Sequence, residues 1–267
     1  MLTISIVVYK PNFKILERAL DSIFVSLSQN PILLEESKII IIDNGNQRKI
    51  LDNTVRTYLD NGLQINIVSS VDNIGYGKAH NLAILNSLSK YHLILNPDVI
   101  LSTDVLMIGL EYLEGNEDVA AINPKCFDDN NKVQYIAKTY PNLLVLLVRG
   151  VAPKFIKNIF VKKLSKYEVR KIVDKDEISE IEIMSGCFML CRTEALKKIN
   201  GFDDRFFLYF EDFALSIELR KLGKLMYIPS MKIIHLGGHA SRKGMRHIFY
   251  FISSGIRFFN QYGWKFL

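Results

Sequence analysis

The stretch LTISIVVYKPNFKILERALDSIFVSLSQNPILLEESKIIIID, residues 2–43, decides the fold, because it predicts a strand, a helix and a second strand. Leu2 to Tyr9 is rich in the β-branched residues that favour strands. After Asn12, which is suited to cap a helix, apolar side chains recur at the three- and four-residue spacing of a buried helix face. The second strand, Lys38 to Ile42, is almost wholly apolar, as expected when helices cover both faces of a sheet.

The same alternation continues through the first half of the chain. The further elements expected are strands at Ile65 to Ser69, Tyr91 to Leu95 and Val119 to Ile122, a helix at Lys78 to Ser89, and another that starts at Thr103. Strands that alternate with helices of about a dozen residues predict βαβ units. We therefore expect an α/β fold with a mostly parallel sheet flanked by helices.

The second half breaks this rhythm. Ile136 to Lys175 is apolar and basic and is expected to be helical, and Gly201 to Gly223 predicts an acidic loop that leads into a helix. Leu225 to Leu236 predicts two short strands around Pro229. An aromatic and basic helix is expected from about Arg246 to Tyr262. Without repeats or low-complexity linkers, the chain is expected to be one continuous domain with a C-terminal helical extension.

Composition and simple sequence features argue against a disordered, membrane-spanning, secreted or disulfide-rich protein. With 267 residues, 49% hydrophobic and 23% charged, the chain is typical of a globular protein. No run approaches the roughly 18–20 apolar residues that span a bilayer. The N-terminus has no basic region followed by a cleavage site, so we expect no signal peptide and a cytoplasmic location. Cys126, Cys187 and Cys191 lack the spacing of a disulfide or zinc framework and are expected to be buried thiols in a reducing compartment.

Positive charge is concentrated in two segments. Arg149 to Lys175 contains nine Lys or Arg and two acids, and the chain after Glu218 contains nine Lys or Arg and no acid. A basic face can serve nucleic acid, anionic lipid or a phosphate-rich substrate, or can simply be solvated. Since no nucleic-acid recognition motif accompanies it, we do not expect a nucleic-acid partner.

Polar, sharply turning segments follow the predicted strands. These strand exits are Tyr9 to Asn12, Asp43 to Asn46, Asp72 to Gly77 and Asn96 to Asp98. Ligands of open α/β sheets bind beyond the carboxyl ends of the strands, so the four exits predict a ligand crevice. No G-x-G-x-x-G motif follows the first strand, which argues against a dinucleotide-binding Rossmann enzyme.

Four residues are candidates for chemistry. Asp98 suits Mg²⁺ or Mn²⁺, which take oxygen ligands, although it can equally end the strand or cap a helix. Glu211 and Asp212 follow a run of aromatic residues that would raise the pKa of a carboxyl and make it a general base; they also suit the N-terminus of a helix. His235 can bind a metal or a leaving phosphate, or be structural.

Seven segments, taken in order, resemble the family 2 inverting glycosyltransferases, particularly the bacterial rhamnosyltransferase-like branch that builds O-antigen and capsular polysaccharide. The segments are SIVVYKPN, IIIDNGN, DNIGYGKAHN, LILNPDV, SGCFML, GFDDRFFLYFEDFALSIELRKLG and IIHLGGHAS, which together span roughly residues 4–241. The resemblance implies a GT-A fold over residues 1–243. Residues 1–124 would form the donor nucleotide-binding half and 125–243 the acceptor and catalytic half, with a basic aromatic helix at 244–267.

The resemblance also implies roles for residues. The donor-binding residues would be Tyr9 and Asp43 at the nucleobase and ribose, then Asn73, Gly75, Asn81 and Asn96. Asp98 would bind Mg²⁺ or Mn²⁺ with His235 at the metal or diphosphate, and Asp212, rather than Glu211, would be the base.

Two positions depart from the family pattern. Asn96 replaces a carboxylate, which leaves a less charged metal site, and Ala214 replaces a second acid. An alternative to an enzyme is therefore a degenerate protein that binds a nucleotide sugar without catalysis.

The resemblance favours dTDP-rhamnose as donor and leaves UDP-hexoses open, so the expected enzyme is a hexosyltransferase. The acceptor would be a glycan or a polyprenyl-diphosphate-linked saccharide. The helix carrying Arg246 and Arg257 would then lie peripherally on the cytoplasmic face of the inner membrane, and it suits an ordinary packing helix or a homodimer contact equally well.

Overall fold

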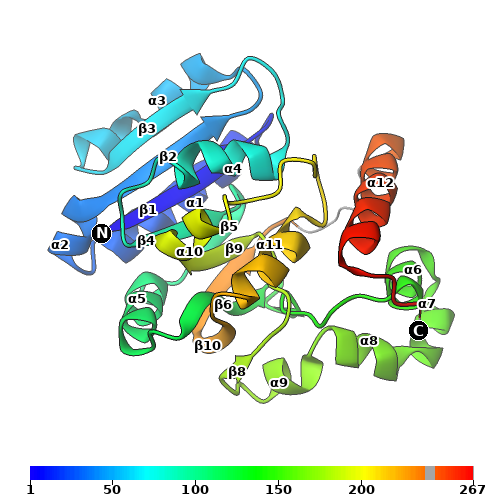
Figure 1. Ribbon diagram of the computed structural model, residues 1–267. Helices are drawn as coiled ribbons and strands as arrows, with labels where there is room; N and C mark the ends of the chain where they lie inside the picture. The colour runs from blue at the N-terminus through cyan, green and yellow to red at the C-terminus, as the bar shows by residue number, and fades with distance from the viewer. Residues whose placement is uncertain (238–243, 267) are drawn as a thin grey trace.

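The computed structural model describes residues 1–237 and 244–266, and within them ten strands form one sheet (Figure 1). The strands are β1 (Leu2–Val8), β2 (Ser37–Asp43), β3 (Gln64–Ser69), β4 (Tyr91–Leu95), β5 (Val99–Leu101), β6 (Val119–Phe127), β7 (Val133–Gln134), β8 (Ser179–Glu180), β9 (Phe188–Arg192) and β10 (Lys224–His235). The order across the sheet is β3-β2-β1-β4-β9-β6-β10-β5, with β7 beside β6 and β8 beside β10.

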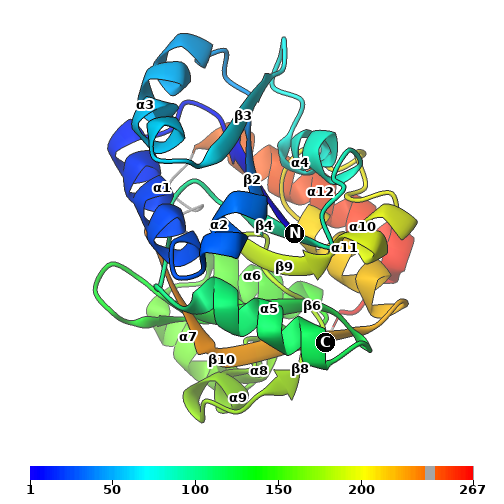
Figure 2. The same cartoon turned by 90° about the vertical axis from the view of Figure 1, so that its left-hand side faces the viewer.

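Helices cover both faces of the sheet and also form a separate group with the C-terminal helix. They are α1 (Phe13–Leu27), α2 (Pro31–Glu36), α3 (Arg48–Asp60), α4 (Tyr76–Ile84), α5 (Val105–Gly115), α6 (Leu143–Val151), α7 (Lys154–Ile159), α8 (Val161–Tyr167), α9 (Arg170–Asp174), α10 (Thr193–Lys198), α11 (Glu211–Arg220) and α12 (Met245–Tyr262). Helices α1, α3 and α5 pack on one face, and α4, α10 and α11 lie on the other (Figure 2).

The first half of the sheet confirms the βαβ prediction. Strands β3, β2, β1 and β4 are mutually parallel, so their carboxyl ends meet at one edge. Alternate side chains of β1 face opposite layers: Ile4 and Ile6 pack against α1, whereas Val7 packs against α4. Covering both faces explains why the strands are almost entirely apolar.

The second half of the sheet is mixed rather than parallel. Strand β9 pairs antiparallel with both β4 and β6, whereas β10 runs parallel to β6 and antiparallel to β5. The prediction of two strands around Pro229 is wrong, because β10 continues from Lys224 to His235. Its register against β6 shifts between Ile228 and Lys232, since a proline has no N–H to give to the ladder.

Several helix boundaries also differ from the predictions. Helix α5 begins at Val105 after Asp104 rather than at Thr103, and α4 covers 76–84 rather than 78–89. The segment 136–175 is helical only from Leu143 and is divided into four short helices. Asn142 caps the first of them by accepting a hydrogen bond from Val145 N, and Pro153 separates it from the second.

A separate aromatic core holds the C-terminal helix against the domain. Helices α6, α8, α11 and α12 share this core, in which Phe210 packs on Phe258 with ring centroids 5.3 Å apart. The predicted C-terminal helix is therefore confirmed. The expectation for the three cysteines is confirmed as far as burial and absence of a disulfide partner are concerned. None of the helices in the described ranges is both long and apolar enough to cross a membrane.

Candidate active site

The polar exits of β1 and β2 meet at one edge of the sheet. The Asp43 carboxylate is buried and accepts hydrogen bonds from Gly45 N (3.0 Å) and Gln47 N (2.6 Å), which fold the turn after β2. Tyr9 lies next to this turn, since a Cβ at Gly45 would come within 3.5 Å of Tyr9 Cα, and its side chain is half-exposed. The Tyr9 ring is therefore open to a ligand, whereas Asp43 shapes the turn beneath it.

Asn44 is a site residue that the sequence reasoning missed. Its buried amide donates to Asn73 Oδ1 (2.9 Å) and Gly75 O (3.1 Å), and its oxygen accepts from Ile74 N (3.2 Å). Asn73 in turn accepts from Gly75 N (3.0 Å), so its side-chain oxygen holds the loop. The only signal in the sequence was an Asx-Gly turn, which does not reveal such a distant partner.

Gly75 brings this loop against the acidic loop of residues 201–210. Its φ is +91°, and a Cβ at this position would lie 2.6 Å from Phe207 O. The next residue, Tyr76, donates its N–H to the same oxygen (3.0 Å). Only glycine combines this backbone conformation with so close an approach.

The Tyr76 hydroxyl connects two parts of the site. It lies 3.0 Å from Asn96 Oδ1 and 2.7 Å from Gly186 O. Asn96 follows β4, and Gly186 precedes β9, the neighbouring strand. The Asn96 oxygen therefore faces Tyr76, which the sequence reasoning had not included.

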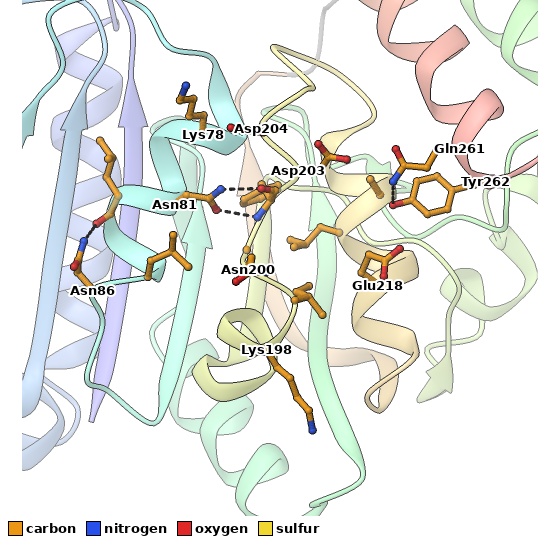
Figure 3. Close-up of a pocket in the computed structure, with 17 residues that line it drawn as sticks. Lys78, Asn81, Asn86, Lys198, Asn200, Asp203, Asp204, Glu218, Gln261 and Tyr262 are labelled. Atoms are coloured by element: carbon orange, nitrogen blue, oxygen red, sulfur yellow. Dashed lines mark hydrogen bonds between the residues drawn. The ribbon is translucent and has the colours of Figure 1, made fainter.

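Asn81 holds the acidic loop through a paired contact. Its amide donates to Phe202 O and accepts from Phe202 N, both at 2.8 Å, and a side chain at Gly201 would collide with it. Asn81 also lines a cavity of about 860 Å³ between α4 and α11, with Glu218 and Tyr262 on its other side (Figure 3). Neither Asp98 nor Asp212 lines this cavity, so the role of Asn81 in donor binding remains a prediction.

Asp98 and His235 lie together as predicted for a metal site. Asp98 Oδ1 is 3.4 Å from His235 Nε2, and Leu236 N donates to the Asp98 backbone oxygen (2.9 Å). Gly237 passes so close that a Cβ there would collide with the Asp98 carboxylate. The Asp98 carboxylate suits Mg²⁺ or Mn²⁺, and the His235 imidazole beside it can act as a further ligand, so these residues fit the implied ion. The rest of the IIHLGGHAS motif, residues 238–241, lies outside the described residues.

Across residues 1–237 and 244–266, no group of three His, Cys, Asp or Glu side chains is arranged to hold a metal. Two protein ligands suffice for an ion that keeps waters and substrate phosphates in its shell.

Asp212 and Glu211 begin helix α11 in different surroundings. Asp212 Oδ2 accepts from Gly186 N and Oδ1 from Phe213 N, each at 3.0 Å, and the residue is partly exposed. Glu211 is buried, and its Oε2 makes no hydrogen bond within the described residues. Burial and then the charge of Asp212 raise the pKa of Glu211 well above its usual value, and burial raises that of Asp212 too. Glu211 therefore keeps its proton more readily than Asp212.

A strained turn presents these two carboxyls. Tyr209 (φ +69°) and Phe210 (φ +64°) are consecutive aromatic residues in the left-handed region, which is unfavourable for bulky side chains. Phe210 is buried against α12, and this packing offsets the strain. Phe206 is buried in the same core. The Phe206 and Phe210 rings are therefore part of the aromatic core and do not line an open pocket at the Glu211 and Asp212 carboxyls.

Lys138 is a buried cation that the sequence reasoning also missed. Its backbone pairs with Ile183 in both directions (2.9 and 3.0 Å), and its Nζ donates to Tyr135 O (3.1 Å). Burial and the charge of Arg149 lower its pKa to about 8, against the attraction of Asp212 and Glu168. Reciprocally, the ammonium lowers the pKa of Asp212. Lys138 lies outside the basic segment 149–175, and no charge pattern in the sequence singled it out.

Replacing Lys138 by Met is expected to narrow the active pH range from the acid side. A carboxylate can act as a base only when ionised, and the groups that set the pKa of Asp212 are Glu211, Lys138 and the N–H groups of Gly186 and Phe213. Removing the cation raises the pKa of Asp212 further, so the acid limb of the pH profile of kcat/KM moves to higher pH. The pH profile of Lys138→Arg, which keeps the charge, is the control. A limb that stays in place in Lys138→Met contradicts the coupling.

Known proteins match this chain in sequence. The sequence profile of glycosyl transferase family 2 matches residues 3–199. Rhamnosyltransferase WbbL of Escherichia coli (strain K12) is 30% identical over 179 residues, which is 63% of each chain. An N-acetylglucosaminyl-diphospho-decaprenol L-rhamnosyltransferase of Mycobacterium tuberculosis is 24% identical over 239 residues, 85% of this chain and 73% of that protein. The match to WbbL thus spans less than two thirds of its length.

Solved glycosyltransferase structures share the fold. GalNAc-T7, solved with UDP, GalNAc and Mn²⁺, superposes with a TM-score of 0.65 at 15% identity, over 89% of this chain and 43% of that one. The mannosyltransferase PcManGT of Pyrobaculum calidifontis, solved with GDP-Man and Mn²⁺, has a TM-score of 0.62 at 14% identity, over 96% and 64%. These similarities confirm the GT-A fold. Because the family profile covers most of the chain, the protein belongs to glycosyl transferase family 2.

Proposed function

We propose that the protein is an inverting glycosyltransferase that moves L-rhamnose from dTDP-rhamnose to a glycan or lipid-linked saccharide. One observation carries the proposal: hydrogen bonds connect the start of helix α11 to residues Asn96 to Asp98 after β4, here called the metal loop. Asp212 is bound to Gly186 N, and Gly186 O and Asn96 both contact the Tyr76 hydroxyl. The proposed base, Asp212, and the proposed diphosphate anchor, Asp98, are therefore connected at the edge of the sheet where β4 ends. The names of the two rhamnosyltransferase relatives support the choice of sugar.

The proposed reaction is a single displacement. The acceptor hydroxyl gives its proton to Asp212 as its oxygen attacks the anomeric carbon, and the bond from that carbon to the nucleoside diphosphate breaks on the opposite face. Asp212 is suited to this role because two backbone N–H groups orient its carboxylate and part of it remains exposed. Glu211, buried and inclined to keep its proton, is less suited.

Asp98 and His235 would hold Mg²⁺ or Mn²⁺ beside the donor diphosphate. When bound, such an ion offsets the negative charge of the leaving group. The two solved neighbours contain Mn²⁺ together with UDP or GDP-mannose, which supports a divalent cation and a nucleotide-sugar donor. Tyr9 would pack on the nucleobase above Asp43, and the loop that Asn73 and Gly75 shape would line the donor site.

A donor screen by thermal shift tests the proposal. We expect dTDP-rhamnose to raise the melting temperature more than UDP-glucose or GDP-mannose does, and to do so mainly when Mn²⁺ is present. Stabilisation by a UDP-hexose alone would keep the enzyme class and change the sugar. If no nucleotide sugar stabilises the protein with or without Mn²⁺, the proposed function is wrong.

A binding protein without catalysis is a second candidate. The substitutions at Asn96 and Ala214 favour it, since both positions lack the acid that the family pattern carries. Release of nucleoside diphosphate from the donor that binds would separate the two candidates, because a pure binding protein leaves the donor intact.

The acceptor is proposed to be linked to a polyprenyl diphosphate. The mycobacterial relative's name describes such an acceptor, N-acetylglucosaminyl-diphospho-decaprenol. An enzyme that acts on it would work peripherally at the cytoplasmic face of the inner membrane. A homodimer remains the other role for the C-terminal helix.

A further inference from the structure

Helix α12 presents a second apolar face that is largely exposed in the described chain. One face, with Phe258 and Phe259, is buried in the aromatic core. Five exposed apolar residues of the helix lie on the second face at helical spacing: Met245, Ile248, Phe249, Ile252 and Ile256. Phe251 is also exposed (39%), but its ring packs on Phe210. Phe249 alone is 68% exposed. A regular stripe of this kind is a surface that meets something other than water.

Helix α7 carries similar side chains. Phe155 is 68% exposed and Ile159 is 74% exposed. Side chains on the solvent side of a short helix are usually polar, whereas these two are large and apolar. Val161, two residues after Ile159 at the start of α8, is exposed as well. Exposed apolar residues also occur elsewhere on the molecule, which is normal, but α12 carries six of them, more than any other helix of the described residues.

The two helices belong to one lobe. Helices α6, α8 and α12 share the aromatic core, and the segment after α12 binds the start of α6 through Leu143 N to Lys265 O (2.8 Å). The Tyr140 hydroxyl also donates to Gly263 O (2.7 Å). Figure 1 shows α6, α7, α8 and α12 together on the side of the molecule away from β3. The exposed apolar residues are thus held in one part of the protein.

The charges of these helices indicate which kind of partner binds the exposed apolar residues. Helices α7, α8 and α12 contain no Asp or Glu. Their exposed basic residues are Lys162, Lys163, Lys166, Arg246 and Arg257. A second copy of the chain would bring cations against cations in a two-fold contact, which is unfavourable. Nucleic acid would leave the isoleucine side chains without an apolar partner. Apolar side chains flanked by cations suit the interface of an anionic bilayer.

We propose that α7 and α12 dock the protein on an anionic phospholipid surface, with Phe155, Ile159 and the α12 stripe entering the headgroup boundary. The docking needs no transmembrane helix. Its purpose rests on the proposed function, because it would bring the active site to a lipid-linked acceptor.

Co-sedimentation with vesicles tests the proposal on the full chain. The variants are Phe249→Ser with Ile252→Ser on α12, and Phe155→Ser with Ile159→Ser on α7. The matched control is Val71→Ser with Leu88→Ser, which removes two apolar residues that are even more exposed (96% and 97%) from loops between residues 1 and 124. We expect each helix pair to lower binding to phosphatidylglycerol vesicles about tenfold or more, with the control unchanged. Wild-type binding to phosphatidylcholine vesicles should be much weaker, and high salt should weaken the anionic binding.

Three results would overturn the docking. The first is equal sedimentation of the wild type and both helix-pair variants. The second is equal binding of the wild type to neutral and anionic vesicles. The third is a wild-type dimer that the α12 variant converts to a monomer, which would assign the surface to a second copy of the chain. All four altered residues are exposed, so melting temperatures should match the wild type and show that the fold is intact. Transfer to a water-soluble saccharide acceptor should be the same in the helix pairs as in the wild type. Absence of transfer by the wild type would count against the proposed function and leave the vesicle result standing.

Discussion

Asp212→Asn is expected to lower the transfer rate by about 10²–10⁴-fold while donor binding stays close to that of the wild type. Asparagine has nearly the same shape and can still accept one of the two backbone hydrogen bonds that the carboxylate receives from Gly186 and Phe213. It cannot accept the proton of the acceptor hydroxyl. The chemical step therefore fails, and the groups that hold the donor remain in place. Single-turnover transfer and donor titration, measured on the same preparation, separate the two effects.

Glu211→Gln is the matched control for this prediction. Glutamine reproduces the protonated form of Glu211, which burial and the neighbouring charge already favour. It also removes a like charge beside Asp212, so the transfer rate should change much less than in Asp212→Asn. If instead Glu211→Gln stops transfer and Asp212→Asn does not, the roles of the two carboxyls are reversed.

Asp98→Ala is expected to remove most of the gain in donor affinity that Mn²⁺ provides, by about tenfold or more. Asp98 and His235 are the two protein groups that lie together at the metal loop, 3.4 Å apart, and the imidazole alone is a poor partner for a hard cation. Calorimetric titration with dTDP, with and without Mn²⁺, measures the change. Affinity without metal should alter little, because the residues that follow β1 and β2 are untouched.

Asp104→Ala controls for the loss of one negative charge near the same strand. Asp104 is exposed, and its carboxylate accepts a hydrogen bond from Ser102 (3.0 Å) beyond the metal loop. It should leave the effect of Mn²⁺ intact. Equal Mn²⁺ dependence in Asp98→Ala and the wild type would remove Asp98 from the metal site.

Local patterning was sufficient for the parallel half of the fold. The β-branched runs and the helix-spaced apolar residues between them act over a few residues, and β4 (Tyr91–Leu95) has the bounds that its sequence predicts. The strand exits followed from the parallel order, since carboxyl ends of parallel strands share an edge. The structure also places Asp98 beside His235, whereas the metal-binding role that the motifs imply for the two residues stays a prediction.

Long-range packing decided the features that the patterns missed. Pro229 reads locally as a strand break, but pairing with β6 on both sides carries β10 through it. Asn44 and Asn81 look like ordinary turn and helix residues until the fold brings Gly75 and Phe202 to their amides. Lys138 looks like one more surface cation, and only burial gives it influence on Asp212. Each of these contacts joins residues at least 29 positions apart, a separation at which no local pattern in the sequence reports the partner.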